Sequence, residues 1–416
     1  MRIPAVMFSL SAVVLSAAGA SKQASLGATV FEGARVIVGT GAAPIENATF
    51  LVEGARISTV GTAGSVRVPA SARRVDLTGK TVMPSIVDTH THLSATREAL
   101  EQDLRRRPFY GVSAAMSLGT DEGDAALGMR GQTVPGMARV FSAGRGITRP
   151  EVGRTTVPYW INTEAEGRNA VRELAARKVD IVKIWVDDRN GAYPKLTPAL
   201  YTAIIDEAHR NKLRVTAHIF TLDDAKGLLR AGLDAFAHGI RDRDLDDEVV
   251  TLFRERQNVV LVPNLPDRGV RVDLAWLKES LPAAEWDKLE AGNTDRPQVQ
   301  ATWGIQARNL ATLNAAGVRI ALGTDGNNPY APHVEMADMV AAGMTPMAVI
   351  VAATRNSAEF VRMTDTGTIE AGKSADFLVL DANPLDDITN TRRIHAVYLR
   401  GVEVDRAPFR VTAANR

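Results

Sequence analysis

The sequence predicts an α/β protein whose centre is a (β/α)8 TIM barrel, with a small β-sandwich-like domain built from both ends of the chain. The middle of the chain alternates eight apolar, strand-like runs with helical stretches, which is the pattern of such a barrel. Both ends instead carry short β-rich runs between Gly, Asn and Pro. A doubly wound sheet is the competing fold, but no Gly-rich phosphate turn follows an early strand.

The first 20 residues have the pattern of a signal peptide. A short basic start, Met1-Arg2, precedes an apolar run over 3–18, and Ala18-Gly19-Ala20 supplies small residues before a cleavage site. A membrane-anchoring helix is the alternative, but the run is short for a bilayer span. We therefore expect an exported protein, periplasmic or secreted, with no membrane attachment in its mature form.

The rest of the chain divides into three segments. Residues 21–82 and 363–416 are expected to form the two parts of the β domain, and residues 83–362 the barrel. The expected barrel strands are, in order, SIVDTHTHL, GVSAAMSLG, ARVFSAG, VDIVKIWV, LRVTAHIF, LDAFAHGI, NVVLVPNL and VRIALGTDG. The expected helices between them include EGRNAVRELAARK, PALYTAIIDEAHRNK, DDAKGLLRAG and GIQARNLATLNAAG.

The connection over 265–300 is unusually long for one that follows a barrel strand. Connections beyond about 15 residues are often lids or binding loops. This one leaves the carboxyl end of the seventh strand, where barrel enzymes place their sites. A lid and a solvated helical excursion are both consistent with the sequence.

Charge and cysteine content exclude several functions. The 416 residues include 49 Lys and Arg, 48 Asp and Glu, and no Cys. A near-neutral balance argues against nucleic acid or an anionic membrane as the main partner, because both select basic surfaces. Without Cys there are no disulfides, thiolate metal ligands or Cys nucleophiles. Any metal ion must have nitrogen and oxygen ligands.

Six polar residues fall at the carboxyl ends of five predicted strands. Residues i and i+2 of a strand face the same way, so the two imidazoles of the first strand can converge on one ion. A lysine within an apolar strand is costly to bury without a partner. Active sites of barrels are built from the ends of several strands, so we expect these six residues to form one site. They are His90, His92, Lys183, His218, His238 and Asp325.

This order of residues resembles the amidohydrolase superfamily, in its two-metal, carbamylated-lysine subtype. Within it, the chain is most similar to imidazolonepropionase-like amidohydrolases and prolidase-type dipeptidases. The resemblance rests on PSIVDTHTHL, VKIW, TAHIFT, FAHG, GTDG and the late GTIEAGKSADFLVLD with VYLRG. It covers the chain after the signal peptide, except for 265–300.

The resemblance implies a role for each of the six residues. His90, His92 and Asp325 would hold a buried metal ion, and His218 and His238 an outer one. Lys183, carboxylated by CO2, would bridge the two ions beside a hydroxide that attacks the substrate. Asp325 would also be the catalytic base. A ligand set of nitrogen and oxygen suits two Zn2+ ions first, with Mn2+, Co2+ or Fe2+ as alternatives.

Other residues on the same rim are candidates for substrate binding. Arg145 could form a bidentate contact with a carboxylate. Dipeptidases of this branch commonly have Tyr where this chain has Phe220, and often Glu where it has Ala237, so strict dipeptidase specificity is not expected. His333 could line the pocket or pack a loop. The substrate-binding candidates are Arg145, Trp185, Phe220, Asn264, Tyr330 and His333.

The function expected from these features is a metal-dependent hydrolase acting on C–N bonds. The expected substrate is a small-molecule amide: an N-acyl amino acid, a dipeptide or an aryl amide. A lactonase, esterase or phosphotriesterase with the same two-metal site is the alternative. Deamination is less expected, because the superfamily's deaminases generally lack the bridging lysine. A non-catalytic barrel would lack a ligand, and none is missing here. Superfamily members are often homo-oligomers, so a homo-oligomer is an open expectation.

Overall fold

The structure, a computed structural model, describes residues 27–411. The expected signal peptide, residues 1–20, lies outside the described residues. Within the described part of the chain, no helix has both the length and the apolar character needed to cross a membrane.

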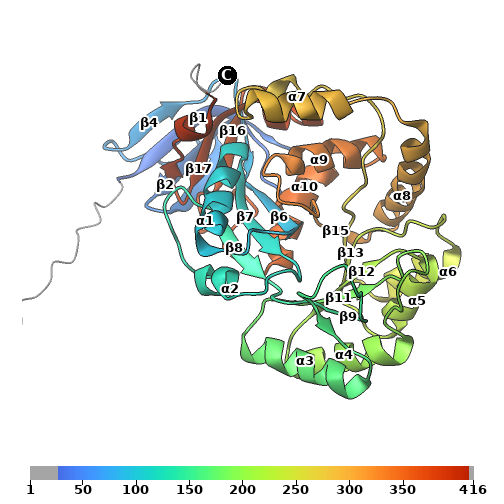
Figure 1. Cartoon of the computed structure of the whole chain (residues 1–416). Helices are drawn as coiled ribbons and strands as arrows, with labels where there is room; N and C mark the ends of the chain where they lie inside the picture. The colour runs from blue at the N-terminus through green and yellow to red at the C-terminus, as the bar shows by residue number, and fades with distance from the viewer. Residues whose placement is uncertain (1–26, 412–416) are drawn as a thin grey trace, which may run out of the picture.

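Strands from both ends of the chain form one eight-stranded sheet (Figure 1). Its order is β18-β17-β16-β5-β1-β2-β3, and β4 pairs with β1. The strands are β1 (Thr29–Val36), β2 (Ile45–Glu53), β3 (Arg56–Thr62), β4 (Arg73–Asp76), β5 (Thr81–Pro84), β16 (Phe377–Leu380), β17 (Ile394–Leu399) and β18 (Val402–Glu403).

This terminal sheet is strongly curved around an aromatic cluster. The rings of Phe31 in β1 and Phe377 in β16 have centroids 5.2 Å apart. β5 separates these strands, and two strand spacings in a flat sheet would be about 9.6 Å. The sheet must therefore bend so that its inner face packs on itself. On its other face, Leu378 and Val397 join the main core of the molecule, as the two-residue period of a strand requires.

The middle of the chain forms parallel strands in two sheets of three and seven strands. The first sheet contains β6 (Ile86–Thr91), β7 (Val112–Ser117) and β8 (Arg139–Ser142). The second has the order β10-β9-β11-β12-β13-β14-β15. Its strands are β9 (Ile147–Thr148), β10 (Tyr159–Trp160), β11 (Val182–Val186), β12 (Val215–Ile219), β13 (Ala235–Ala237), β14 (Val260–Val262) and β15 (Arg319–Ile320).

Backbone hydrogen bonds connect the two parallel sheets at both of their junctions. The amide of Asp180, just before β11, donates to Ser142 at the end of β8 at 3.0 Å. On the other side, the amide of Thr89 in β6 donates to Leu322, just after β15, at 2.9 Å. Within residues 27–411 the ladders themselves do not join into one closed sheet. The α/β class is therefore observed, and the closed barrel of the sequence prediction is not.

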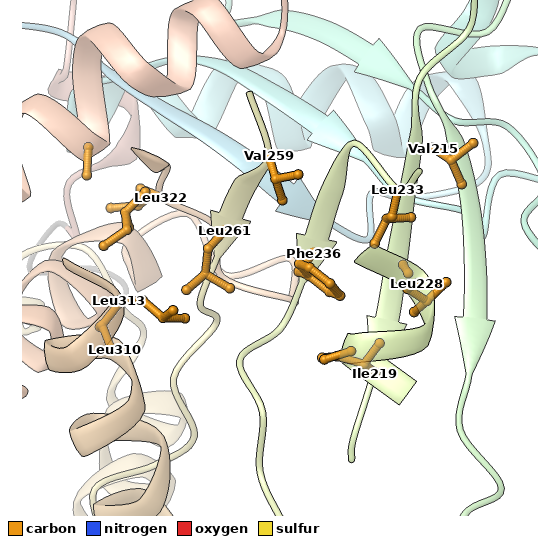
Figure 2. Packing of buried hydrophobic residues seen from close by; sticks show 14 of the residues in the cluster. Val215, Ile219, Leu228, Leu233, Phe236, Val259, Leu261, Leu310, Leu313 and Leu322 are labelled. Carbon is orange, nitrogen blue, oxygen red and sulfur yellow. The ribbon is translucent and has the colours of Figure 1, made fainter. Parts of the chain in front are cut away.

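Helices cover the parallel strands, and Figure 1 shows α3, α4 and α5 outside β11 to β13. The helices are α1 (Arg97–Arg106), α2 (Ala125–Met129), α3 (Glu164–Ala176), α4 (Pro198–Arg210), α5 (Leu222–Arg230), α6 (Asp247–Glu255), α7 (Ala283–Gly292), α8 (Pro297–Ala315), α9 (Ala331–Ala341), α10 (Pro346–Val351) and α11 (Ser357–Phe360). Figure 2 shows Phe236 and Leu261 on successive strands, with Leu310 of α8 in the same packed layer.

The segment over 265–300 is folded onto the molecule. It contains a short 3-10 turn (Ala275–Leu277) and α7. Leu277 and Leu281 are buried against Phe109 and Tyr110. The segment thus has an apolar base of its own, and whether it opens as a lid stays a prediction.

Candidate active site

The predicted site residues lie where the parallel strands end. His90 lies in β6, Lys183 in β11 and His218 in β12, while His238 directly follows β13. Asp325 follows β15 in the segment that pairs with β6 through the Thr91–Gly326 bridge. Parallel strands place their carboxyl ends on one side, so these side chains come from five strands to one place.

Asp325 connects three of the histidines. Its Oδ1 lies 3.1 Å from Nε2 of His90 and 2.9 Å from Nε2 of His92. Its Oδ2 lies 3.5 Å from Nε2 of His238. Burial alone would raise the pKa of Asp325, but these imidazoles hold it well below its ordinary value. The carboxylate is therefore charged, and it lies at the centre of the cluster.

Lys183 and His218 complete the cluster. Lys183 is buried, and its Nζ lies 3.5 Å from Nε2 of His90. Burial lowers the pKa of Lys183 to about 7, against the opposing effect of Asp325. The ring of His218 is centred 4.4 Å from that of His238. The structure thus brings all six predicted residues into one connected group.

The buried histidines are neutral. Burial lowers the pKa of His90 to about 4, that of His218 to about 3, and that of His238 well below its ordinary value. A neutral imidazole keeps one nitrogen lone pair, which is the form that binds metal ions. These three imidazoles are therefore in the protonation state that binds metal ions at neutral pH.

Neighbouring polar groups orient these rings. Nδ1 of His90 lies 2.9 Å from Oδ1 of Asn264, an acceptor, so Nδ1 donates and the lone pair is on Nε2. Nδ1 of His92 lies 2.9 Å from Oγ1 of Thr120. Asn264 and Asp325 have positive backbone φ angles of 44° and 54°. Such uncommon conformations often occur at functional sites.

His218 contacts two residues that follow β11. Its Nε2 lies 2.9 Å from Oδ2 of Asp187 and 3.0 Å from Nη1 of Arg189. Arg189 also donates to Asp187 at 2.6 Å. Burial alone would raise the pKa of Asp187, but the bonds from His218 and Arg189 hold it below its ordinary value. Asp187 would accept a proton from Nε2, whereas the guanidinium of Arg189 can only donate to a lone pair there, so the two contacts correspond to opposite tautomers of His218.

The predicted substrate contacts have different surroundings. Arg145 donates to the backbone oxygens of Val157 and Pro158, and its guanidinium lies 4.2 Å from the ring centre of Tyr159. These contacts fix the rim segment that follows β9. Arg145 is therefore occupied within the protein, which disfavours its predicted role as a carboxylate clamp.

His333 does not line the site. Its ring is buried, with Nδ1 3.0 Å from Oγ1 of Thr391 and Nε2 2.9 Å from the backbone oxygen of Tyr110. Both ring nitrogens are thus used in packing α9. Of the two roles that the sequence left open, the structure supports packing, and the substrate-binding role is corrected.

The aromatic candidates pack against neighbouring residues of the protein. Trp185 packs so closely on Gly146 that a Cβ there would lie 2.0 Å from its ring. Phe220 lies under the guanidinium of Arg241, 5.7 Å away. Tyr330 packs against Tyr110, at 6.1 Å between ring centroids. Asn264 supports His90 and keeps its buried Nδ2 without a partner among the described residues.

Two arginines near the cluster were missed by sequence reasoning. Nη2 of Arg189 and Nε of Arg241 are buried and have no hydrogen-bond partner among residues 27–411. Arg241 affects the pKa values of both Lys183 and His218, so its charge acts on the cluster. Both residues lie in loops, where no periodic pattern marks them. The positive φ of Arg189, 54°, is visible only in the structure.

The cluster fits a divalent metal ion. His90, His238 and Asp325 each offer one ligand atom within 4.8 Å of the others. Two ligands of one zinc ion lie within about 4.2 Å of one another, and both imidazoles are nearer than that to the carboxylate of Asp325. Nε2 of His238 is buried without a hydrogen-bond partner among the described residues. A buried orphan nitrogen of this kind is what a metal ion would satisfy.

The chain is similar to several known proteins. Residues 81–404 match the model of the amidohydrolase family. The chain is 28% identical over 385 residues to an imidazolonepropionase of Streptomyces coelicolor, covering 86% of this chain and 89% of that protein. It is 30% identical over 233 residues to an ochratoxinase of Aspergillus niger, covering 54% of this chain and 45% of that protein. The solved structure of a Xaa-Pro dipeptidase with bound methionine has a TM-score of 0.72 at 23% identity, over 91% of this chain and 99% of that one.

Proposed function

Because the chain belongs to the amidohydrolase family, in the branch with imidazolonepropionase-like and prolidase-like members, we propose that it hydrolyses the amide bond of a small substrate that carries a carboxylate. It is a hydrolase that acts on C–N bonds. The proposed substrate class is N-acyl amino acids and dipeptides. The observation that carries the proposal is the connected group of four histidines, Lys183 and Asp325 at the strand ends.

These residues would hold two divalent ions. We propose His90, His92 and Asp325 for one ion, His218 and His238 for the other, and carboxylated Lys183 between them. Carboxylation by CO2 requires an uncharged amine, and burial lowers the pKa of Lys183 to about 7. When bound, divalent ions would lower the pKa of a water molecule and polarise the substrate carbonyl. Zn2+ suits the ligand set best.

Asp325 would transfer a proton from the attacking water to the leaving nitrogen. Its carboxylate is ionised at neutral pH, which is the form that a general base requires, and it lies within 3.5 Å of three imidazoles. Hydrolysis of an amide requires that proton on the leaving nitrogen. Asp325 therefore takes the proton from the attacking water and delivers it to the amine that leaves.

The two unexpected arginines support a substrate with a carboxylate. Each has a buried N–H without a partner among the described residues, and leaving such a donor unsatisfied is costly. A guanidinium binds a carboxylate through its N–H groups. Arg189 lies beside His218 and Arg241 lies over Phe220. We assign to Arg189 and Arg241 the binding of the substrate carboxylate, which the sequence analysis suggested for Arg145.

The same proposal includes two features of the whole chain. We propose that the two parallel sheets are arcs of one (β/α)8 barrel, because backbone hydrogen bonds link them at both junctions. We also propose export after removal of residues 1–20. N-terminal sequencing of the exported protein supports this if it begins at Ser21, and an intact Met1 contradicts it.

A matched pair of amides tests the substrate class. N-Benzoylglycine and N-methylbenzamide differ in the carboxylate, and we expect kcat/KM to be at least tenfold higher for the acid. Arg241→Ala should remove most of this difference, whereas Arg254→Ala, an exposed arginine of α6, should keep it. Turnover of lactones or phosphotriesters, with none on a panel of N-acyl amino acids and dipeptides, would contradict the proposal.

Metal content tests the ligand set. Elemental analysis of protein prepared with bicarbonate should find about two equivalents of divalent metal, and Lys183→Ala should lose metal and activity together. Full metal content with full activity in Lys183→Ala contradicts the bridging role.

A further inference from the structure

A cavity lies at the opposite end of the parallel strands from the proposed catalytic cluster. Its volume is about 450 Å³, and it includes Arg139 and Val140 at the amino end of β8. Its other walls come from the terminal sheet, at Arg56 and Arg400, and from the chain after α11, at Arg362. Cavities of this size at the junction of two structural units are common ligand sites.

The charges around this cavity are unbalanced. Five arginines line it, and Asp365 is the only carboxylate among its lining residues; the arginines are Arg56, Arg130, Arg139, Arg362 and Arg400. Arg139 is paired with Asp365 at 2.9 Å and with Asp376 at 3.3 Å, and Arg130 lies 3.4 Å from Asp180.

Three of the five arginines have no ion pair. Among residues 27–411, no carboxylate oxygen lies within 4.0 Å of the guanidinium of Arg56, Arg362 or Arg400, since none of these forms a salt bridge. Arg56 donates to the backbone oxygen of Gly372, and Arg400 to that of Val134. Over the residues described, none of these three guanidinium groups is directly paired with a carboxylate, although the charge of Asp365 acts on Arg56 and those of Asp365 and Asp376 act on Arg400. Arginines still outnumber carboxylates at the cavity, so it favours an anion.

Two of these arginines occupy unusual backbone positions. Arg362 and Arg400 have φ angles of 60° and 53°, in the left-handed region that Gly and Asn usually occupy. Arg362 lies just beyond α11, and Arg400 lies in the turn between β17 and β18. Glycine would relieve the strain at both turns, yet both carry a guanidinium into the lining of the same cavity.

We propose that this cavity binds a small multivalent oxyanion, such as a phosphate or a dicarboxylate, at a site separate from the catalytic cluster. Guanidinium groups match the paired oxygens of both classes. The anion would contact Arg56 and Arg400 of the terminal sheet together with Arg362 of the central part. It would thereby connect the two units and stabilise the folded chain by mass action.

Calorimetric titration of the full chain with inorganic phosphate and with succinate, at constant ionic strength, tests this site. We expect one anion per chain with saturable binding, and the tighter of the two probes identifies the class. Arg56→Ala combined with Arg362→Ala should weaken the binding of the anion at least tenfold, because two of the guanidinium groups that line the cavity are removed. The fold should tolerate this change, because both side chains are exposed and neither has an ion pair to lose. Arg254→Ala, the matched exposed control, should leave Kd unchanged.

The site must also be distinguished from the catalytic cluster. We expect the double variant to keep its amide turnover and its melting temperature Tm without anion, while the rise of Tm with anion is lost. Absence of saturable binding by both probes overturns the proposal. So does binding that the double variant retains, or that an amide substrate displaces, because the anion would then occupy the catalytic cluster.

Discussion

Asp338 of α9 makes stability depend on pH. It is 7% exposed, and its nearest cation is Arg268, at 3.7 Å. Burial raises the pKa of Asp338 to about 7, Arg268 opposes this, and Asp267 adds to it. The folded pKa lies above the unfolded value of about 3.9. The folded protein therefore binds this proton more tightly than the unfolded chain does. The resulting contribution to the free energy of unfolding is complete below about pH 4 and is lost as the pH rises through 7.

Asp338→Asn should remove this dependence. Relative to the wild type, the variant should become more stable between pH 5 and pH 8, by no more than about 4 kcal/mol. Chemical denaturation of both proteins across this range measures the difference. Asp287→Asn, on the exposed side of α7, is the control and should show no such trend. A pH-independent difference for Asp338→Asn would mean that Asp338 stays charged in the folded protein.

That the six polar residues lie together could be predicted because two local properties coincided. His90, Lys183 and Asp325 have side chains with the right chemistry, and each occurs where a strand-like run ends. Arg189 and Arg241 could not be predicted, because the path of a loop is set by tertiary packing. His333 is close to Asp325 in the sequence, but α9 directs its ring away toward packing partners.

Helix α3 depends on a capping box at its start. Oγ1 of Thr163 accepts from the amide of Glu166 at 3.3 Å, and the Glu166 carboxylate accepts from the amide of Thr163 at 2.9 Å. Thr163→Ala should lower the free energy of unfolding by about 1 kcal/mol, because the amides at the start of the helix lose a partner. Glu166→Gln keeps an acceptor and should cost much less. Equal losses in the two variants, measured by denaturant titration, would exclude the box as the cause.

Prediction worked best for elements with a strong local pattern. The run PALYTAIIDEAHRNK begins at Pro198, where α4 begins, and the eight strand-like runs coincide with β6, β7, β8 and β11 to β15. Helix α8 begins at Pro297, seven residues before the expected stretch. The sequence analysis missed these residues because 297–303 has no clear apolar period. The two-residue strands β9 and β10 carry too little sequence to be recognised.

At the scale of the whole molecule, strand β16 links the core of the terminal sheet to the main core of the central part. Alternate residues of β16 face different sides: Leu378 joins the main core, and Val379 joins the aromatic cluster of the sheet. Leu378 reaches the start of β7, where a Cβ on Gly111 would lie 2.6 Å from its side chain. A strand whose two faces complete two cores couples their stability.

We therefore expect the chain to unfold in one calorimetric transition. Leu378→Ala should lower the Tm of that transition through a loss of about 2 to 5 kcal/mol, the range for a buried leucine. Val379→Ala, which removes a smaller side chain from the opposite face of β16, should lower the same transition by less. Two transitions, with Val379→Ala moving one and Leu378→Ala the other, would show that the sheet unfolds independently. A single shared transition means instead that the terminal sheet and the central part, with its cluster of six polar residues, lose their structure together.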